Sequence, residues 1–314
     1  AVVEPPDAEK DRKLRASLLA LGYNEAVSLT FISRPDAEEF SAVRLVELDN
    51  PQSEEATIMR SSLVPGMLNM LAYNLNRGLE SVRLFEMGSI FEYVPSSILR
   101  ETTVTAEPKR ICMGATSPPS HKTQVWGTQD GEFFHLKGDV ENLLRPFQYR
   151  ALSFDAQASD YYHSGRSARV LMDGAMVAQF GQIRRSIATA RKLRQDVFLA
   201  EIYLDRLYTH GLRLVRYEPL PRYPAVERDF SFVFDDGVTF EQIQQAVIGF
   251  RPSEWRSFVP VEVFRGGNVP AGKYSMLLRV KFQSAEHTLR EDEVAQWSAR
   301  IIAALEGLGG KLRA

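Results

Sequence analysis

Apolar and polar positions alternate most regularly in the last third of the chain. Phe230, Phe232 and Phe234 take every second position of one segment, and residues 275–283 alternate in the same way. Successive side chains of a β-strand point to opposite faces, so both segments are predicted to be strands with one buried face. Residues 257–265 are predicted to form a further strand.

Two other segments of this region carry apolar side chains at helical spacing, residues 239–250 and the stretch after Thr288. Thr288 and Glu291 have the spacing of a capping box, in which Thr288 begins the helix and Glu291 returns a hydrogen bond to it. Residues 311–313 are predicted to add an edge strand. The order of elements is then βαββαβ, which is a ferredoxin-like fold.

The first part of the chain mixes helices with strands, which makes the whole chain α+β. Leu68, Leu71 and Leu75 recur at helical spacing after Pro65, and Gly78 follows them as a helix stop. Further elements are predicted along this part: a helix at 8–21, strands at 82–92 and 110–115, a loop at 93–107, a helix from 134, and mostly strands from 151 to 204.

A linker is expected between the two regions. Three prolines fall within residues 216–224, and neither a helical nor a strand period runs through them. We therefore expect one domain over residues 1–216 and a second over residues 217–314.

Length and charge set broad limits on function. The chain has 314 residues and a formal net charge of −2, which suits two domains and argues against a strongly basic nucleic-acid binder, DNA binding included. Residues 217–314 hold twelve lysines and arginines against thirteen acidic residues, so bulk charge does not support RNA binding there. A local basic patch stays compatible with these sums, because counter-charges elsewhere cancel it.

Cys112 is the single cysteine. One thiol cannot form an internal disulfide, which indicates a reducing compartment and predicts a cytoplasmic location. No apolar run approaches the roughly 20 residues that span a bilayer, so no membrane association is expected. The first residue is not methionine, and we expect the chain to be a fragment or a processed chain.

No nucleotide-binding P-loop, zinc-binding HExxH, hydrolase GxSxG or paired CxxC motif occurs. The histidines are dispersed rather than clustered, at positions His121, His135, His163, His210 and His287. Metal binding by His and Cys needs clustered ligands, so no metal site is expected, and Cys112 is interpreted as a core residue. The sequence thus predicts no self-sufficient active site.

Three features still invite a binding function. Arg265, Arg279 and Lys281 are expected on the open face of the βαββαβ sheet, where a positive surface suits loop or single-stranded RNA. The alternative is an ordinary solvated face. Residues 265–275 contain glycines that suit a phosphate cradle, but a hairpin loop is favoured because no helix follows them. The basic run at 184–194 is interpreted as a solvated helix face in preference to a phosphate contact.

Stretches spread over nearly the whole chain, in consistent order, carry a resemblance to one family. They include LGYNEAVSLTFI (21–32), NPQSEEATIMRSSLVPGML (50–68), VRLFEMGSIF (82–91), HLKGDVENLL (135–144), HSGRSARV (163–170), RYPAVERDFSF (222–232) and VPAGKYSMLLRVKFQ (269–283). Together they resemble the C-terminal part of the β subunit of bacterial-type phenylalanyl-tRNA synthetase.

The resemblance implies that the first domain is a class II synthetase-like module, built on an antiparallel sheet and without a catalytic role. Residues 82–92 would correspond to the strand that carries the substrate-binding motif in active class II folds. Such folds also need a glycine-rich segment ending in an arginine, and no convincing version occurs between Gly165 and Glu201. No catalytic residue and no metal ligand is therefore assigned.

The resemblance also implies that residues 217–314 form a ferredoxin-fold anticodon-binding domain, which in the family contacts the anticodon stem-loop of tRNA-Phe. The RNA-binding candidates are its cations Arg222, Arg228, Arg265, Lys273, Arg279 and Lys281. Class II folds place the helix after Pro65 at a subunit interface, and its leucines are expected to divide between core and partner surface. The interface candidates are Arg60, Leu68, Leu71, Asn74, Leu75 and Arg77.

The family's complete enzyme is an α₂β₂ ligase that activates phenylalanine with ATP and Mg²⁺ and then esterifies tRNA-Phe. We expect the α subunit to supply the adenylation chemistry, and this chain to supply a subunit interface and an RNA-docking arm without binding a cofactor. An editing domain and Mg²⁺ ligands would lie before Ala1. The main alternative is a protein-interaction scaffold without RNA contact, and a stand-alone class II-like ligase is a weaker one.

Overall fold

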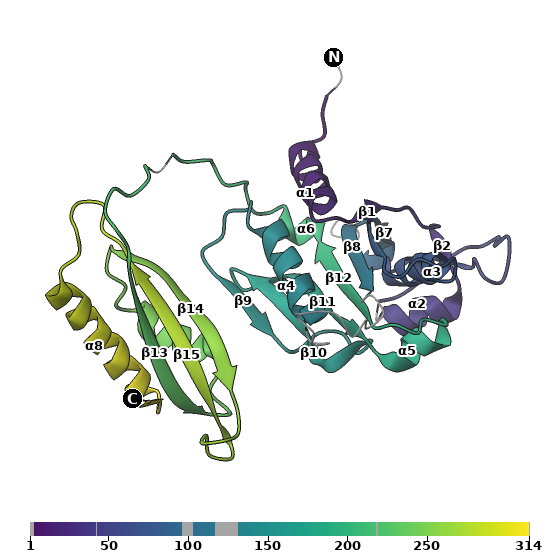
Figure 1. Ribbon diagram of the computed structural model, residues 1–314. Helices are drawn as coiled ribbons and strands as arrows, with labels where there is room; N and C mark the ends of the chain where they lie inside the picture. Colours follow the sequence, from purple (N-terminus) through teal and green to yellow (C-terminus); the bar gives the residue numbers. More distant parts are fainter. Residues whose placement is uncertain (1–2, 42, 96–102, 117–130, 218, 314) are drawn as a thin grey trace. The chain divides into compact units, whose positions relative to one another are not determined.

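A computed structural model describes residues 3–41, 43–95, 103–116, 131–217 and 219–313. Contacts divide the chain into two compact units, Ala1–Leu214 and Val215–Ala314 (Figure 1). We call them the N-terminal unit and the C-terminal unit. His121, the segment 117–128 and part of the predicted loop 93–107 lie outside the described residues.

The N-terminal unit is built on a sheet of seven strands. Their order is β1 (Asn24–Glu25), β5 (Arg83–Ser89), β8 (Lys109–Thr116), β12 (Val197–Tyr203), β11 (Ala175–Ile183), β10 (Tyr162–Met172) and β9 (Leu152–Asp155). Neighbours pair antiparallel except β1 and β5, which are parallel. This confirms the mixed α+β class with an antiparallel sheet.

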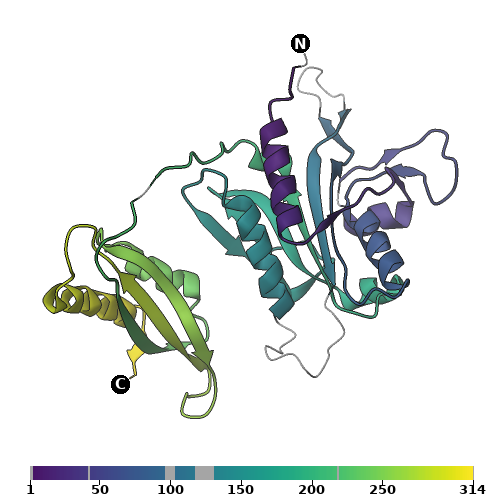
Figure 2. The same ribbon diagram turned by 45° about the horizontal axis from the view of Figure 1, so that its top comes forward.

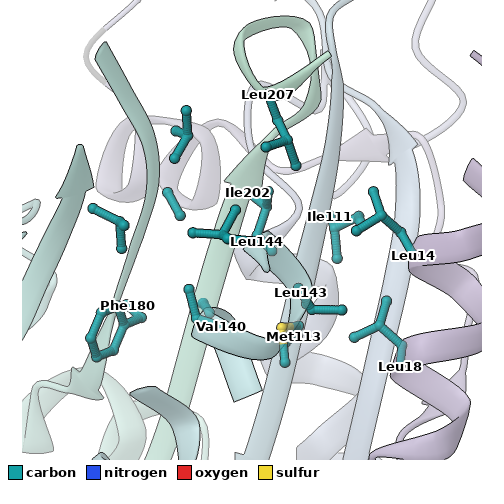
Figure 3. Close-up of a cluster of buried hydrophobic side chains, with 14 of the residues drawn as sticks. Leu14, Leu18, Ile111, Met113, Val140, Leu143, Leu144, Phe180, Ile202 and Leu207 are labelled. Carbon is teal, nitrogen blue, oxygen red and sulfur yellow. The ribbon is translucent and has the colours of Figure 1, made fainter. Parts of the chain in front are cut away.

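Helices cover both faces of this sheet (Figure 1, Figure 2). On one face, α1 (Ala8–Ala20) and α4 (Gly131–Leu144) pack on the strands, and Figure 3 shows Leu14 and Leu18 of α1 near Ile111 and Met113 of β8. The short helix α6 (Leu204–Leu207) adds to this core. Apolar residues therefore fill the space that an open sheet face would leave for a ligand.

The second face is covered by α2 (Arg34–Phe40), α3 (Val64–Leu75) and α5 (Arg185–Ala190). A Cβ added to Gly114 of β8 would lie 2.8 Å from Met67 and 2.9 Å from Leu71 of α3, so glycine permits the close approach of helix and strand. The basic run at 184–194 forms α5 and its flanks, with Ile187 and Ala188 buried. Arg191 of this run pairs with Asp36 and Glu39 of α2.

Short strands complete the N-terminal unit. One small sheet has the order β2 (Phe31–Ile32), β4 (Ile58–Met59), β3 (Val46–Glu47), and β6 (Glu92–Pro95) pairs with β7 (Thr103–Ala106). The prediction of a loop over residues 93–107 was therefore wrong where β6 and β7 lie. Their pairing joins positions as far apart as Glu92 and Ala106, and neither short segment has a period that marks it as a strand by itself.

The C-terminal unit has the predicted βαββαβ order. It contains β13 (Val226–Asp235), α7 (Phe240–Ile248), β14 (Trp255–Phe264), β15 (Lys273–Phe282), α8 (Glu291–Gly307) and β16 (Lys311–Leu312). The strands form an antiparallel sheet in the order β14-β15-β13-β16. Phe230, Phe232 and Phe234 face a core shared with both helices, as their alternation predicted.

Two local predictions have different outcomes. The segment joining β14 to β15 is a hairpin loop, with Gly266, Gly267 and Gly272 at positive φ, as favoured over a phosphate cradle. The predicted start of the last helix was wrong by two residues. The N-cap is Arg290, whose backbone N–H donates to the Glu293 carboxylate at 2.8 Å, because the chain around Thr288 still connects strand to helix.

In the part of the chain that the structure describes, no helix combines the length and the apolar character that crossing a membrane requires.

Candidate functional site

The exposed face of the C-terminal sheet carries a row of cations on β15 and a row of carboxylates on β13. The strand register places Lys281 opposite Glu227, Arg279 opposite Asp229, and Lys273 opposite Asp235. We call these side chains the open face. Alternation along both strands places them together, because Phe230, Leu278 and the other apolar positions point to the helices.

Each cation of the open face contacts a carboxylate. Nε and Nη2 of Arg279 each donate a 2.7 Å hydrogen bond to the Asp229 carboxylate, and Lys281 Nζ lies 3.7 Å from Glu227. Lys273 also pairs with Asp235. The hydrogen bonds from Arg279 lower the pKa of Asp229 and raise that of Arg279 itself. The row of positive charge that the sequence predicts is present, but an equal row of negative charge neutralises it.

The remaining RNA-binding candidates lie elsewhere. Arg228 occupies the helix-facing side of β13 and donates two 2.8 Å hydrogen bonds to Glu291 at the start of α8. Arg265 lies in the hairpin loop and pairs with Asp236. Arg222 is exposed and has no ion pair with any described residue. The structure thus brings together only part of the predicted set, on a face without net positive charge.

Cations that the sequence analysis did not select lie near the end of α7. Arg251, Arg256 and Arg300 are exposed, and within the described ranges none of them pairs with a carboxylate. The sequence feature that could have revealed two of them is that each directly follows an aromatic residue, in Phe250-Arg251 and Trp255-Arg256. Because α8 brings in Arg300 from far along the chain, this grouping was not visible before folding.

The interface candidates divide between the interior and the surface of α3. Leu68 and Leu71 have no exposed surface and Arg60 has 7%, so these three side chains are unavailable to a partner. Leu75 and Asn74 are half-buried. Arg77 is exposed, and its Cζ lies 3.3 Å from the ring centroid of Tyr73, which is also exposed. The outward side of α3 is therefore polar and aromatic rather than leucine-rich.

A row of polar side chains crosses the N-terminal sheet beneath α3. The register aligns Glu86 of β5, Cys112 of β8, Glu201 of β12 and Gln179 of β11 as direct neighbours on successive strands. All four are buried. We call them the buried polar row. The row lies on the face opposite α1 and α4.

Each carboxylate of the buried polar row is held by hydrogen bonds. Arg60 Nη1 lies 2.6 Å from Glu86, and the Ser28 hydroxyl donates to the same carboxylate at 2.7 Å. The Ser62 hydroxyl donates to Glu201 at 3.1 Å, and Tyr161 donates to it as well. Each oxygen of the two carboxylates therefore accepts at least one hydrogen bond, as burial of a polar group requires.

The titratable groups near the row are poor nucleophiles. Burial, with Glu201 and Glu86 nearby, raises the pKa of the Cys112 thiol well above its ordinary value. Burial and Glu201 raise the pKa of Tyr161 in the same way. Among the described residues, no three side chains of His, Cys, Asp or Glu are grouped so that they could hold a metal ion. The arrangement is that of a structural network.

The chain thus combines a helix-covered, mainly antiparallel sheet with a ferredoxin-like unit. Residues 2–204 match the family described as phenylalanyl tRNA synthetase beta chain CLM domain. Residues 221–313 match the ferredoxin-fold anticodon binding domain. The chain belongs to the phenylalanyl-tRNA synthetase β-chain family, which confirms the resemblance found in the sequence.

Individual relatives agree. The phenylalanine–tRNA ligase beta subunit of Bacillus subtilis is 29% identical over 311 residues, which cover 96% of this chain and 37% of that protein. The corresponding subunit of Halalkalibacterium halodurans is 30% identical over 314 residues, covering 96% and 38%. The chain thus spans less than two-fifths of these relatives. A solved pyrrolysyl-tRNA synthetase from Desulfitobacterium hafniense has a TM-score of 0.49 at 15% identity, covering 66% of this chain and 69% of that one.

Proposed function

We propose that this chain acts within a phenylalanine–tRNA ligase as the part of the β subunit that contacts the α subunit and docks tRNA-Phe. The observation that carries the proposal is the pair of family matches, in order, over residues 2–204 and 221–313. The second match is to an anticodon-binding domain, which fits a tRNA-docking role for the C-terminal unit. The cytoplasm as the place of this work stays a prediction.

We further propose that the chain itself performs no adenylation and that the α subunit uses ATP and Mg²⁺. Both faces of the N-terminal sheet are covered by helices, and the carboxylates Glu86 and Glu201 are already held by Arg60, Ser62 and other donors. Glu86 and Glu201 do not fit a magnesium–nucleotide site, because each of their carboxylate oxygens already accepts a hydrogen bond from a protein donor.

The test of this assignment is ATP–pyrophosphate exchange with phenylalanine, measured on the purified chain and on the chain combined with an α subunit and the missing β regions. We expect no exchange by the chain alone and restored aminoacylation by the assembled enzyme. Sustained exchange by the chain alone would refute the division of labour. Failure of the assembly to regain aminoacylation would refute membership of a working ligase.

A protein-interaction scaffold without RNA contact is the second candidate, and a specific observation favours it. The open face has every cation paired with a carboxylate, while Val259, Val261, Val263 and Phe264 of edge strand β14 are each at least 44% exposed. Co-purification with an α subunit, with and without RNase, separates the two candidates. Binding of tRNA-Phe by the chain supports the docking role, and its absence supports the scaffold.

A further inference from the structure

Four side chains form a cluster where α7 ends and β14 begins. The rings of Phe250 and Trp255 meet edge to face, with centroids 6.4 Å apart. The Cζ of Arg251 lies 5.8 Å from the Trp255 centroid, and the Cζ of Arg300 lies 5.6 Å from the Phe250 centroid. We call this group the arginine–aromatic cluster. It lies on the helix side of the C-terminal sheet, away from the open face.

The charge of the cluster is not cancelled by carboxylates. Arg251 and Arg300 are exposed and make no ion pair with the described part of the chain. The acidic residue nearest in sequence is Glu254, and its carboxylate accepts a 2.8 Å hydrogen bond from the Ser253 hydroxyl. Arg256 adds a third exposed guanidinium, which donates to the Ser253 carbonyl at 3.2 Å. An anion can therefore approach without displacing an existing partner.

A groove begins at Arg251 and Trp255 of the cluster. It is shallow and partly open to solvent, with a cavity volume of about 60 Å³, and is lined by Gln244, Val247, Ile248, Arg251, Trp255 and Phe258. The side chain of Ile248 is 43% exposed and supplies an apolar wall, while Gln244 supplies an amide donor and acceptor. Flat apolar walls, one amide and cations at the rim match the needs of an unstacked nucleobase with its phosphate.

We propose that the arginine–aromatic cluster and its groove bind one unpaired nucleotide of an RNA loop. Arg251 and Arg300 contact the phosphates, and the base enters the groove beside Ile248 with its edge toward Gln244. The proposal rests on the RNA-docking role proposed for the C-terminal unit and locates that role on the helix side. RNA is favoured over an acidic protein because the groove pairs exposed cations with aromatic and apolar walls.

The open face provides the contrast that supports this location. There a phosphate would compete with Asp229 for Arg279 and with Glu227 for Lys281. These ion pairs would have to break before a phosphate could bind. At the arginine–aromatic cluster the guanidiniums rest on aromatic rings, which leaves their N–H donors free for phosphate oxygens.

The experiment measures binding of the tRNA-Phe anticodon stem-loop to the complete chain at several salt concentrations. The test variant is Arg251→Gln with Arg300→Gln. The matched control is Arg279→Gln with Lys281→Gln, which removes the same charge from the open face. We expect the test variant to lose about tenfold in affinity, because two charge-assisted contacts with phosphate are removed. Its slope of log affinity against log salt should fall by roughly 1.4, about 0.7 for each lost phosphate contact.

A second measurement reports on the groove itself. With Trp126→Phe and Trp297→Phe, Trp255 is the one tryptophan left in the sequence. Its emission should be quenched by the stem-loop and unchanged by an RNA duplex of equal length, because only the loop offers an unstacked base. Arg251→Lys with Arg300→Lys should keep the salt slope, since both charges remain. Circular dichroism of every arginine and lysine variant should match wild type, because these side chains are exposed or only partly buried.

The outcomes separate this inference from the proposed function. If wild type binds the stem-loop and only the open-face control loses affinity, the inference is wrong and the docking role stands. If wild type does not bind the stem-loop, both are wrong. If the test variant binds RNA normally but no longer co-purifies with an α subunit, the cluster is a protein contact and the RNA proposal is overturned.

Discussion

The two units place the carboxylates of their sheets, and the ion pairs that hold them, in opposite environments. In the N-terminal unit, Glu86 and Glu201 lie under α3 and are 1% and 6% exposed. In the C-terminal unit, Asp229 and Arg279 lie on a face that no helix covers. A buried charge that loses its partner destabilises the folded state because neither water nor an opposite charge solvates it, whereas an exposed charge is solvated by water. The same kind of contact should therefore be essential in one unit and dispensable in the other.

The largest expected effect tests the buried side of this comparison. Arg60→Met removes the partner of Glu86 and should lower the free energy of unfolding by about 3–5 kcal/mol, because a buried carboxylate is left unpaired. The double variant Arg60→Met with Glu86→Leu should recover most of this loss. Urea denaturation of the two variants decides the point, and equal destabilisation of both would show that packing rather than charge dominates.

A second prediction concerns the close approach of α3 to the N-terminal sheet. Gly114→Ala should cost about 1–3 kcal/mol, because the added methyl group meets Met67 and Leu71 in a filled core. Gly138→Ala in α4 is the matched control. A Cβ there meets nothing within 4 Å, and the substitution should stabilise the helix by about 0.5–1 kcal/mol. Thermal unfolding of both variants tests this account, and a lower melting temperature for Gly138→Ala would contradict it.

The pH dependence of stability should be a smaller effect and should involve partly exposed carboxylates in both units. Hydrogen bonds from Arg169 and Arg279 lower the pKa values of Asp155 and Asp229 in the folded protein. A lowered folded pKa gives stability that is present above the unfolded value of about 3.9 and is lost as pH falls through the folded value. Asp229→Asn should make the melting temperature fall less steeply below that pH. If the melting temperature of this variant falls as steeply as that of wild type, Asp229 does not contribute to the acid sensitivity.

The smallest effect is expected for Arg279→Ala on the open face. Its guanidinium and the Asp229 carboxylate are both exposed, so water replaces the lost contact and the melting temperature should change least of all these variants. High salt should remove even that difference by screening the pair. A loss as large as that of Arg60→Met would break the comparison between buried and exposed pairs.

Much of the fold followed from local pattern. The alternation around Phe230 and the helical spacing of Leu68, Leu71 and Leu75 each specify an element and its buried face without reference to the rest of the chain. The paired strands β6 and β7 and the start of α8 did not follow, because each depends on partners or connections outside the segment. The family assignment succeeded because matching stretches spread over the whole chain outweigh any single uncertain element.

The candidate site was less accessible from sequence. The positions of Arg279 and Lys281 on an exposed sheet face could be predicted, but not the carboxylates opposite them, because strand register is a tertiary property. The same holds for Arg300, which α8 carries to Phe250 from fifty residues along the chain.

The sequence by itself determined the α+β class, the βαββαβ order of the C-terminal unit and the family, since periodicity and matching stretches are properties of the chain. Only the tertiary structure decided which charged side chains are paired, which are buried and which stay available to a ligand. It paired the cations of β15 with the carboxylates of β13 and enclosed Glu86 and Glu201 beneath α3. It also left Arg251 and Arg300 beside aromatic rings, with no carboxylate partner among the described residues. The physical reason is that an interaction between charges depends on distance and burial, and both are set when distant segments pack together.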